Sequence, residues 1–228
     1  MTFPACSDPV SADDIRSLRC AIQDIAQSFP GKYRGYDDFI RRLEDVEKGA
    51  VGVDEFRKLQ RDALVANPLV SGSLLLFVVR PQYKPDHHNT ETMFQTNEIN
   101  TASFQPGAAL KTIDLRSGEE RTLVTTSEGS LRDPDVHFDG GRVLFSMRNN
   151  IGDDYHIYEV NADGTGLRQL TRAPGVTDID PLYLADDSIA FSSTREPKYC
   201  MCNRHIMANL YRMEGDGANI RQLGKSTL

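Results

Sequence analysis

The chain has 228 residues, of which 39% are hydrophobic, enough to build a buried core in one large or two small domains. A formal net charge of −7, without any run rich in lysine and arginine, argues against nucleic acid or an anionic membrane as the main partner, because both require a basic surface. No stretch has the length of an apolar membrane span, and the N-terminus lacks the basic and apolar parts of a signal peptide. Taken as complete the chain would be cytoplasmic; as a piece of a longer protein, its start says nothing about location.

Residues 1–68 predict a small helical leader. Ser11 is a suitable N-cap, and apolar residues then recur at helical spacing in three stripes, which end at Pro30, at Gly49 and before Pro68. Cys20 lies on the first of these helices, where we expect a packed small side chain rather than a reactive thiol. The 4 cysteines of the chain do not form a disulfide framework at this length.

From Leu69 onward the composition changes from helical stripes to strands. Residues 133–170 contain short runs rich in Val, Ile, Phe and Tyr that are separated by Asp-Gly and Gly-Gly turns, the pattern of antiparallel strands joined by tight hairpins. We predict four strands in this unit: one in which Val136 and Phe138 alternate, then 142–147, 155–160 and 167–170.

The same unit is repeated along the chain. Asp180-Pro181 repeats Asp133-Pro134, residues 189–192 repeat 143–146, and the Arg-Gln-Leu of 168–170 returns at 221–223. A degenerate earlier copy has its strands at 74–80, 110–115 and 121–123. Repeats of four short strands at a period of roughly 40 to 50 residues are typical of β-propeller blades.

The predicted fold is therefore mainly β: a helical leader (1–68) followed by a partial β-propeller (69–228) with blades at about 69–125, 131–172 and 178–228. An ordinary antiparallel sandwich with accidental internal similarity is the alternative. Since propellers close with about four to eight blades, three blades cannot close a ring, and we expect the chain to be a fragment whose edges a larger protein covers.

Two long insertions, 80–107 and 196–208, replace the same connection between the second and third strands of their blades, so they are expected on one rim of the propeller. They carry Cys200, Cys202, His205, His87 and His88. Thiolates and imidazoles are ligands for zinc, so we predict a metal site at the first three residues, with one of the two adjacent histidines completing a four-ligand version. The alternative is that the cysteines are ordinary loop residues and the histidines form local hydrogen bonds.

The aspartates of the repeat have structural explanations. Asp133 and Asp180, each before a proline, are expected to cap turns that lead into the first strand, and Asp163 and Asp216 to serve the turns before their glycines. No nucleophile elbow, phosphate loop or dinucleotide fingerprint is present, so we assign no catalytic residue.

Two segments carry a family resemblance: Tyr83-Lys-Pro-Asp-His-His-Asn-Thr and Lys198-Tyr-Cys-Met-Cys-Asn-Arg-His-Ile-Met. With the blade sequences, they resemble the middle propeller domain of the hydrazine synthase alpha-subunit family, from about Leu69 to the end of the chain. The resemblance implies an exported or periplasmic multi-domain protein, whose hydrazine-forming members are multihaem enzymes that join nitric oxide with ammonia-level nitrogen. This chain has no Cys-x-x-Cys-His motif, so haem attachment to it is not supported.

Two functional hypotheses follow. The first is a non-catalytic propeller module that binds a protein or a neighbouring domain of its parent chain. The second is a part of a haem- or metal-dependent oxidoreductase of nitrogen metabolism, in which the insertions hold zinc or cover a haem supplied by another domain. Since fold resemblance does not establish a reaction, the first hypothesis is preferred.

Overall fold

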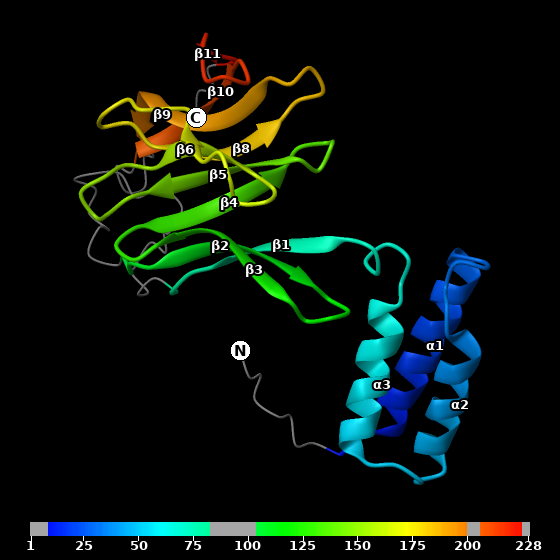
Figure 1. The fold of residues 1–228 in the computed structure, drawn as a ribbon. Coiled ribbons are helices and arrows are strands. Elements are labelled where there is room, and N and C mark those ends of the chain that lie inside the picture. The colour runs from blue at the N-terminus through cyan, green and yellow to red at the C-terminus, as the bar shows by residue number, and fades with distance from the viewer. Residues whose placement is uncertain (1–8, 83–103, 200–205, 225–228) are drawn as a thin grey trace. The chain divides into compact units, whose positions relative to one another are not determined.

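The computed structural model describes residues 9–82, 104–199 and 206–224, without the side chains of 197–199 and 206. Contacts divide the chain into two compact units, residues 1–75 with 113–119, and residues 76–112 with 120–228. The first unit holds the helices with the ends of two strands, and the second holds the rest of the three sheets (Figure 1). Among the described residues, no helix combines the length and the apolar composition needed to cross a membrane.

The helical unit contains α1 (Ala12–Ser28), α2 (Tyr36–Glu47) and α3 (Val53–Val65). The predicted N-cap is confirmed, because the Asp14 N–H donates to Ser11 Oγ (3.1 Å) and the Ser11 N–H donates back to Asp14 Oδ2 (2.9 Å). This reciprocal pair satisfies two backbone donors that the first turn of a helix leaves free.

The three helices pack their apolar stripes against one another. The buried core consists of Leu18, Ile22, Ile25, Tyr33, Phe39, Leu43, Phe56, Leu59 and Ala63. The expectation for Cys20 was wrong: this residue is a free, exposed cysteine. The stripe of α1 faces inward through Leu18, Ile22 and Ile25, and Cys20 lies between two of these positions in the sequence, on the outer side of the helix.

Three sheets follow in chain order (Figure 1). The first has the order β1-β2-β3, the second β4-β5-β6-β7, and the third β11-β10-β9-β8. The strands of the first sheet are β1 (Leu74–Val79), β2 (Ala108–Asp114) and β3 (Glu120–Thr126). Those of the second are β4 (Ser130–Val136), β5 (Arg142–Arg148), β6 (His156–Asn161) and β7 (Arg168–Gln169). Those of the third are β8 (Asp178–Tyr183), β9 (Ile189–Tyr199), β10 (Ile206–Met213) and β11 (Arg221–Gln222).

Consecutive antiparallel sheets of this kind form a mainly β, partial propeller, as predicted. The three strands expected in the earliest copy are all present as β1, β2 and β3, so in the described part of the chain this sheet has one strand fewer than each of the other two. The sequence of this copy is the most degenerate of the three, and no Asp-Pro pair marks a first strand there.

The first strand of the second sheet is also shifted from its predicted place. It ends at Val136, and Phe138 lies exposed in the following turn rather than on the strand. The cause is a β-bulge, because the pairing of β4 with β5 changes register between Arg132 and Asp135, where Asp133 has a φ of 54°. Proline lacks an N–H and is tolerated at a bulge, so Pro134 can occupy this position.

Alternate residues of the second sheet face opposite neighbours. Val143 and Phe145 belong to the core shared with the first sheet, whereas Leu144 and Ile157 belong to the core shared with the third sheet. The second sheet is therefore covered on both faces, which is what a blade in the interior of a propeller requires.

Candidate functional site

Carboxylates of the first strands meet where the second and third sheets pack together, a region we call the seam. Asp133 on β4 and Asp180 on β8 occupy equivalent bulges, with φ values of 54° and 52°. Asp133 Oδ2 accepts from Arg132 Nε (2.6 Å) and from the backbone N–H of Asp180 (3.3 Å). The expectation that these aspartates cap turns was wrong, since both lie inside strands and Asp133 binds the neighbouring sheet.

The two aspartates differ in their electrostatics. Burial and, next, the negative charge of Asp133 raise the pKa of Asp180, although Arg132 lies 3.8 Å from Asp180 and opposes this effect. A second carboxylate of β4 repeats the contact across the seam, because Asp135 Oδ2 accepts from the backbone N–H of Tyr183 (2.8 Å). Acidic side chains of one blade thus bind backbone donors of the next.

A histidine links the turns at one end of the seam. The Nε2 atom of His137 lies 2.8 Å from Asp187 Oδ1, and its Nδ1 atom lies 2.8 Å from Asp139 Oδ1. These hydrogen bonds, first with Asp187 and then with Asp139, raise the pKa of His137. The imidazole also meets the ring of Tyr183 edge-on, with 4.7 Å between the ring centres. Since Asp187 belongs to the turn between β8 and β9, protonated His137 joins the two sheets.

Glu159 collects donors from both sheets beside this histidine. Its Oε1 atom accepts from the Tyr183 hydroxyl (2.8 Å) and its Oε2 atom accepts from Arg168 Nε (2.8 Å). Burial, followed by the hydrogen bond with Glu159, raises the pKa of Tyr183. Arg168 also donates to the carbonyl of Gly215 (3.0 Å), so the cluster spans the seam by side chain and backbone alike.

The opposite end of the seam holds a buried arginine. Arg148 is fully buried at the end of β5, where it donates to the carbonyls of Asn150 (3.1 Å) and Ile151 (2.8 Å). Its guanidinium lies over the rings of Phe104 (4.9 Å) and Tyr155 (5.4 Å), a cation–π arrangement.

The third sheet also has an arginine near this end of its second strand, one residue beyond the position equivalent to Arg148. Arg195 forms an ion pair with Asp178, whose side chain is fully buried. Arg80 follows β1, Arg148 is the last residue of β5 and Arg195 lies within β9, so an arginine recurs near this part of the second strand in each repeat. We did not predict this recurrence, although the aligned repeats contain the signal.

The predicted metal ligands lie outside the described residues: Cys200, Cys202, His205, His87 and His88. The strands on either side of residues 200–205 are described, and there Tyr199 pairs with Ile206. The segment with the two cysteines therefore connects two paired strand ends. Within the described ranges, no group of three His, Cys, Asp or Glu side chains is placed to hold a metal ion.

The turn aspartates were predicted correctly. Asp163 accepts from the Thr165 N–H (2.9 Å) and Asp216 from the Ala218 N–H (2.9 Å), which are Asx-turn contacts.

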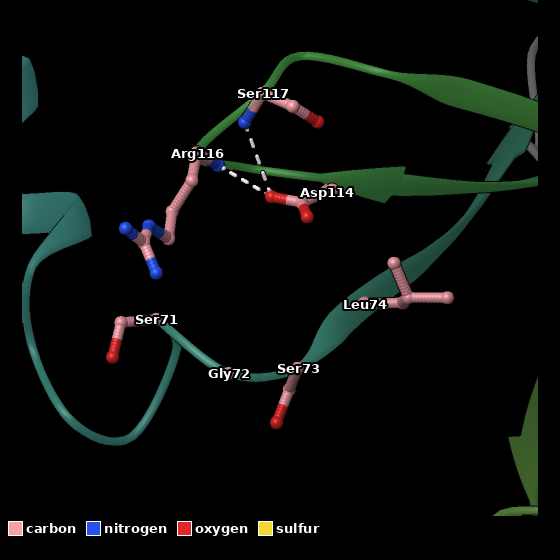
Figure 2. Close-up of a pocket in the computed structure, with 7 residues that line it drawn as sticks. All are labelled: Ser71, Gly72, Ser73, Leu74, Asp114, Arg116 and Ser117. Atoms are coloured by element: carbon pink, nitrogen blue, oxygen red, sulfur yellow. Dashed lines mark hydrogen bonds between the residues drawn. The ribbon is translucent and has the colours of Figure 1, made fainter.

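A separate hollow of about 480 Å³ lies in the first unit, bordered by residues 71–74 and by the turn after β2 (Figure 2). Asp114 binds the N–H groups of Arg116 (2.8 Å) and Ser117 (3.2 Å), so its carboxylate shapes this turn. These backbone hydrogen bonds lower the pKa of Asp114. Arg116 extends across the hollow toward Ser71 in Figure 2.

Part of the chain is similar in sequence to a known protein. No family model matches the sequence. An 83-residue stretch, 36% of this chain, is 35% identical to hydrazine synthase subunit alpha of Kuenenia stuttgartiensis. The chain is distantly similar to hydrazine synthase alpha. The match covers 10% of that subunit, so this chain spans only a small part of its relative.

Solved structures give weaker likenesses. Kuenenia stuttgartiensis hydrazine synthase matches 61% of this chain and 21% of its own chain, with 23% identity and a TM-score of 0.46. Putative TolB from Agrobacterium tumefaciens matches 51% of this chain and 41% of its own, with 22% identity and a TM-score of 0.41.

Proposed function

We propose that the chain is a non-catalytic propeller module that binds and positions a neighbouring protein domain. The carrying observation is the seam, in which carboxylates, a histidine and arginines of the second sheet bind backbone and side-chain groups of the third. Asp133, Asp135 and Glu159 each accept a donor from the following sheet. Buried polar groups that satisfy one another in this way favour one arrangement of the blades, which suits a rigid scaffold.

Measuring whether the chain binds haem or zinc distinguishes this proposal from a redox role. We would purify the chain after expression with a haem precursor and zinc, then measure haem absorbance, metal content and the urea midpoint with and without chelator. A scaffold is expected to retain far less than one haem or zinc per chain, with a midpoint that chelator does not change. One bound group per chain, whose removal lowers the midpoint, would overturn the proposal.

The second candidate is a part of a haem- or metal-dependent oxidoreductase, which the sequence suggests because Cys200, Cys202 and His205 fall within six consecutive residues. Zinc would be held by these three residues and by one histidine of the other insertion, as tetrahedral zinc sites require four ligands.

Zinc content decides whether the two insertions share this site. Cys202→Ser and His88→Ala are each expected to lower the zinc content, and Cys20→Ser, on the outer side of α1, is the matched control that leaves it unchanged. Equal zinc content in all variants and in the unmodified chain would reject the shared site.

A further inference from the structure

The second and third sheets each place the glycine of an Asp-Gly turn against the end of the sheet before them. A Cβ atom built on Gly164 would lie 3.4 Å from Leu123 Cα, and one built on Gly217 would lie 2.7 Å from the carbonyl oxygen of Leu170. Both glycines have positive φ, 86° and 90°. The contact therefore recurs at both junctions between sheets. The positive φ favours glycine at both positions, and at Gly217 the short distance also leaves no room for a side chain.

Backbone pairing identifies the equivalent residues of the second and third sheets. The Leu170 N–H donates to Ile157 O (2.8 Å), and the Leu223 N–H donates to Leu210 O (2.9 Å). Leu210 and Leu223 thus occupy the positions of Ile157 and Leu170. The pairings of Asp135 with Leu144 and of Leu182 with Ala190 match in the same way and make Leu182 the counterpart of Asp135.

Equivalent positions differ sharply in exposure. Ile157 and Leu170 are 0% and 7% exposed because the third sheet covers them, whereas Leu210 and Leu223 are 49% and 48% exposed. Leu182 is 44% exposed, and the side chain of Asp180 is 55% exposed, compared with 21% for Asp133. The third sheet therefore leaves to solvent the face that the second sheet buries.

We propose that this open face, formed by Leu182, Leu210, Leu223 and Asp180, is the docking surface for a further four-stranded propeller blade. This blade would donate a backbone N–H of its first strand to Asp180, as Asp180 itself donates to Asp133. It would place the glycine of a tight turn on Leu223, as Gly217 rests on Leu170. The inference rests on the proposed function and names the partner of the module.

The chemistry of the face favours such a blade over a second copy of this chain. A copy that docked through its first sheet would bring no strand ahead of β1 in its described part, and hence no first-strand N–H for Asp180. A copy that docked through its own third sheet would oppose one Asp180 carboxylate to another, which like-charge repulsion disfavours. Exposed leucines beside an acceptor for backbone N–H instead continue the interface already formed between the second and third sheets.

The experiment offers this face a further blade. In an extended chain, residues 171–223 follow Leu223 a second time, which repeats the spacing between the second and third sheets. Leu210→Cys is introduced in the first copy only, and its labelling by a thiol reagent is followed on the peptide that contains it. The expected result is labelling about tenfold slower than in the unextended chain carrying the same substitution, because the site reacts only when the blade opens.

Two controls define the result. Leu167→Cys, at a position 48% exposed in the second sheet, is expected to label equally in both chains. Asp180→Ala in the extended chain should restore part of the labelling at position 210, since it removes the carboxylate that accepts the N–H.

Unchanged labelling at position 210 overturns the proposal, whether the added blade unfolds or folds apart, because a matching blade was offered and did not dock. Labelling that slows with protein concentration in the unextended chain would instead assign the face to a second copy and also reject it. Bound zinc or haem would defeat the proposed function and leave this readout intact.

Discussion

The second and third sheets are built from one sequence pattern, with the same strand order and the same bulge between their first two strands, although β10 of the third sheet has a further register shift. In the described structure the second sheet is covered on both faces and the third on one. Ile157 and Leu210 occupy equivalent positions, but one is buried and the other is half exposed. Asp133 binds the next sheet and Asp180 does not bind one in the described structure. How much a residue of this repeat contributes to stability therefore depends on whether the next sheet covers it.

Replacing the paired apolar residues tests this comparison most strongly. Ile157→Lys is expected to destabilise the chain by about 3–5 kcal/mol or to prevent folding, because a charge would be buried in an apolar core. Leu210→Lys should change the free energy of unfolding by no more than about 0.5 kcal/mol, since lysine at a half-exposed site keeps its ammonium in water. Urea unfolding followed by circular dichroism measures both, and similar losses for the two variants would contradict the comparison.

Replacing the equivalent aspartates, Asp133 and Asp180, should give a smaller difference in the free energy of unfolding. Asp133→Ala removes an acceptor for Arg132 and for the Asp180 N–H, so we expect a loss of about 1–3 kcal/mol. Asp180→Ala should lie within about 0.5 kcal/mol of the unmodified chain at neutral pH. The pKa of Asp180 is raised in the folded chain, so its ionised form is less favourable there than in the unfolded chain. Alanine removes this charge, and little stability is lost with it. Urea midpoints at pH 7 check the pair, and a larger loss for Asp180→Ala would reverse the assignment.

Much of this fold could be predicted from local sequence. Asp-Gly turns such as Asp163-Gly164, alternating apolar residues and a cap at Ser11 each specify structure within a few residues, and the structure contains them all. The predicted position of the first strand was wrong because it depends on a bulge at Asp133. This bulge forms through pairing with β5, and local sequence carries no information on that pairing.

The seam could be predicted only in part. The recurring Asp-Pro pair was visible in the sequence, yet its partner is a backbone N–H of the next blade, a contact that becomes apparent only when the repeats are stacked. His137 has no counterpart in the other repeats, so the repeat analysis carried no information on its contact with Asp187. The two insertions with the predicted metal ligands remain a prediction, because those residues lie outside the described ranges.

The smallest expected effect concerns the turn that joins the sheets through His137. The pKa of this imidazole is raised above its ordinary value of 6.5, chiefly by Asp187 and then by Asp139, so the folded chain binds this proton more tightly than the unfolded chain does. The resulting stabilisation is complete below about pH 6.5 and is lost as the pH rises through the higher pKa of the folded state.

Urea midpoints measured between about pH 5.5 and 8.5 should therefore fall with pH in the unmodified chain, and His137→Gln should flatten this slope. Asp187→Asn should flatten most of it, because Asp187 is the largest cause of the shift. Asp186→Asn is the matched control: its carboxylate binds Ser188, which lowers its pKa, so any effect falls at acidic pH and the slope above pH 6.5 should persist. If Asp187→Asn left the slope intact, the histidine would be acting within its own sheet, and the seam would owe its closure to Asp133, Asp135 and Glu159.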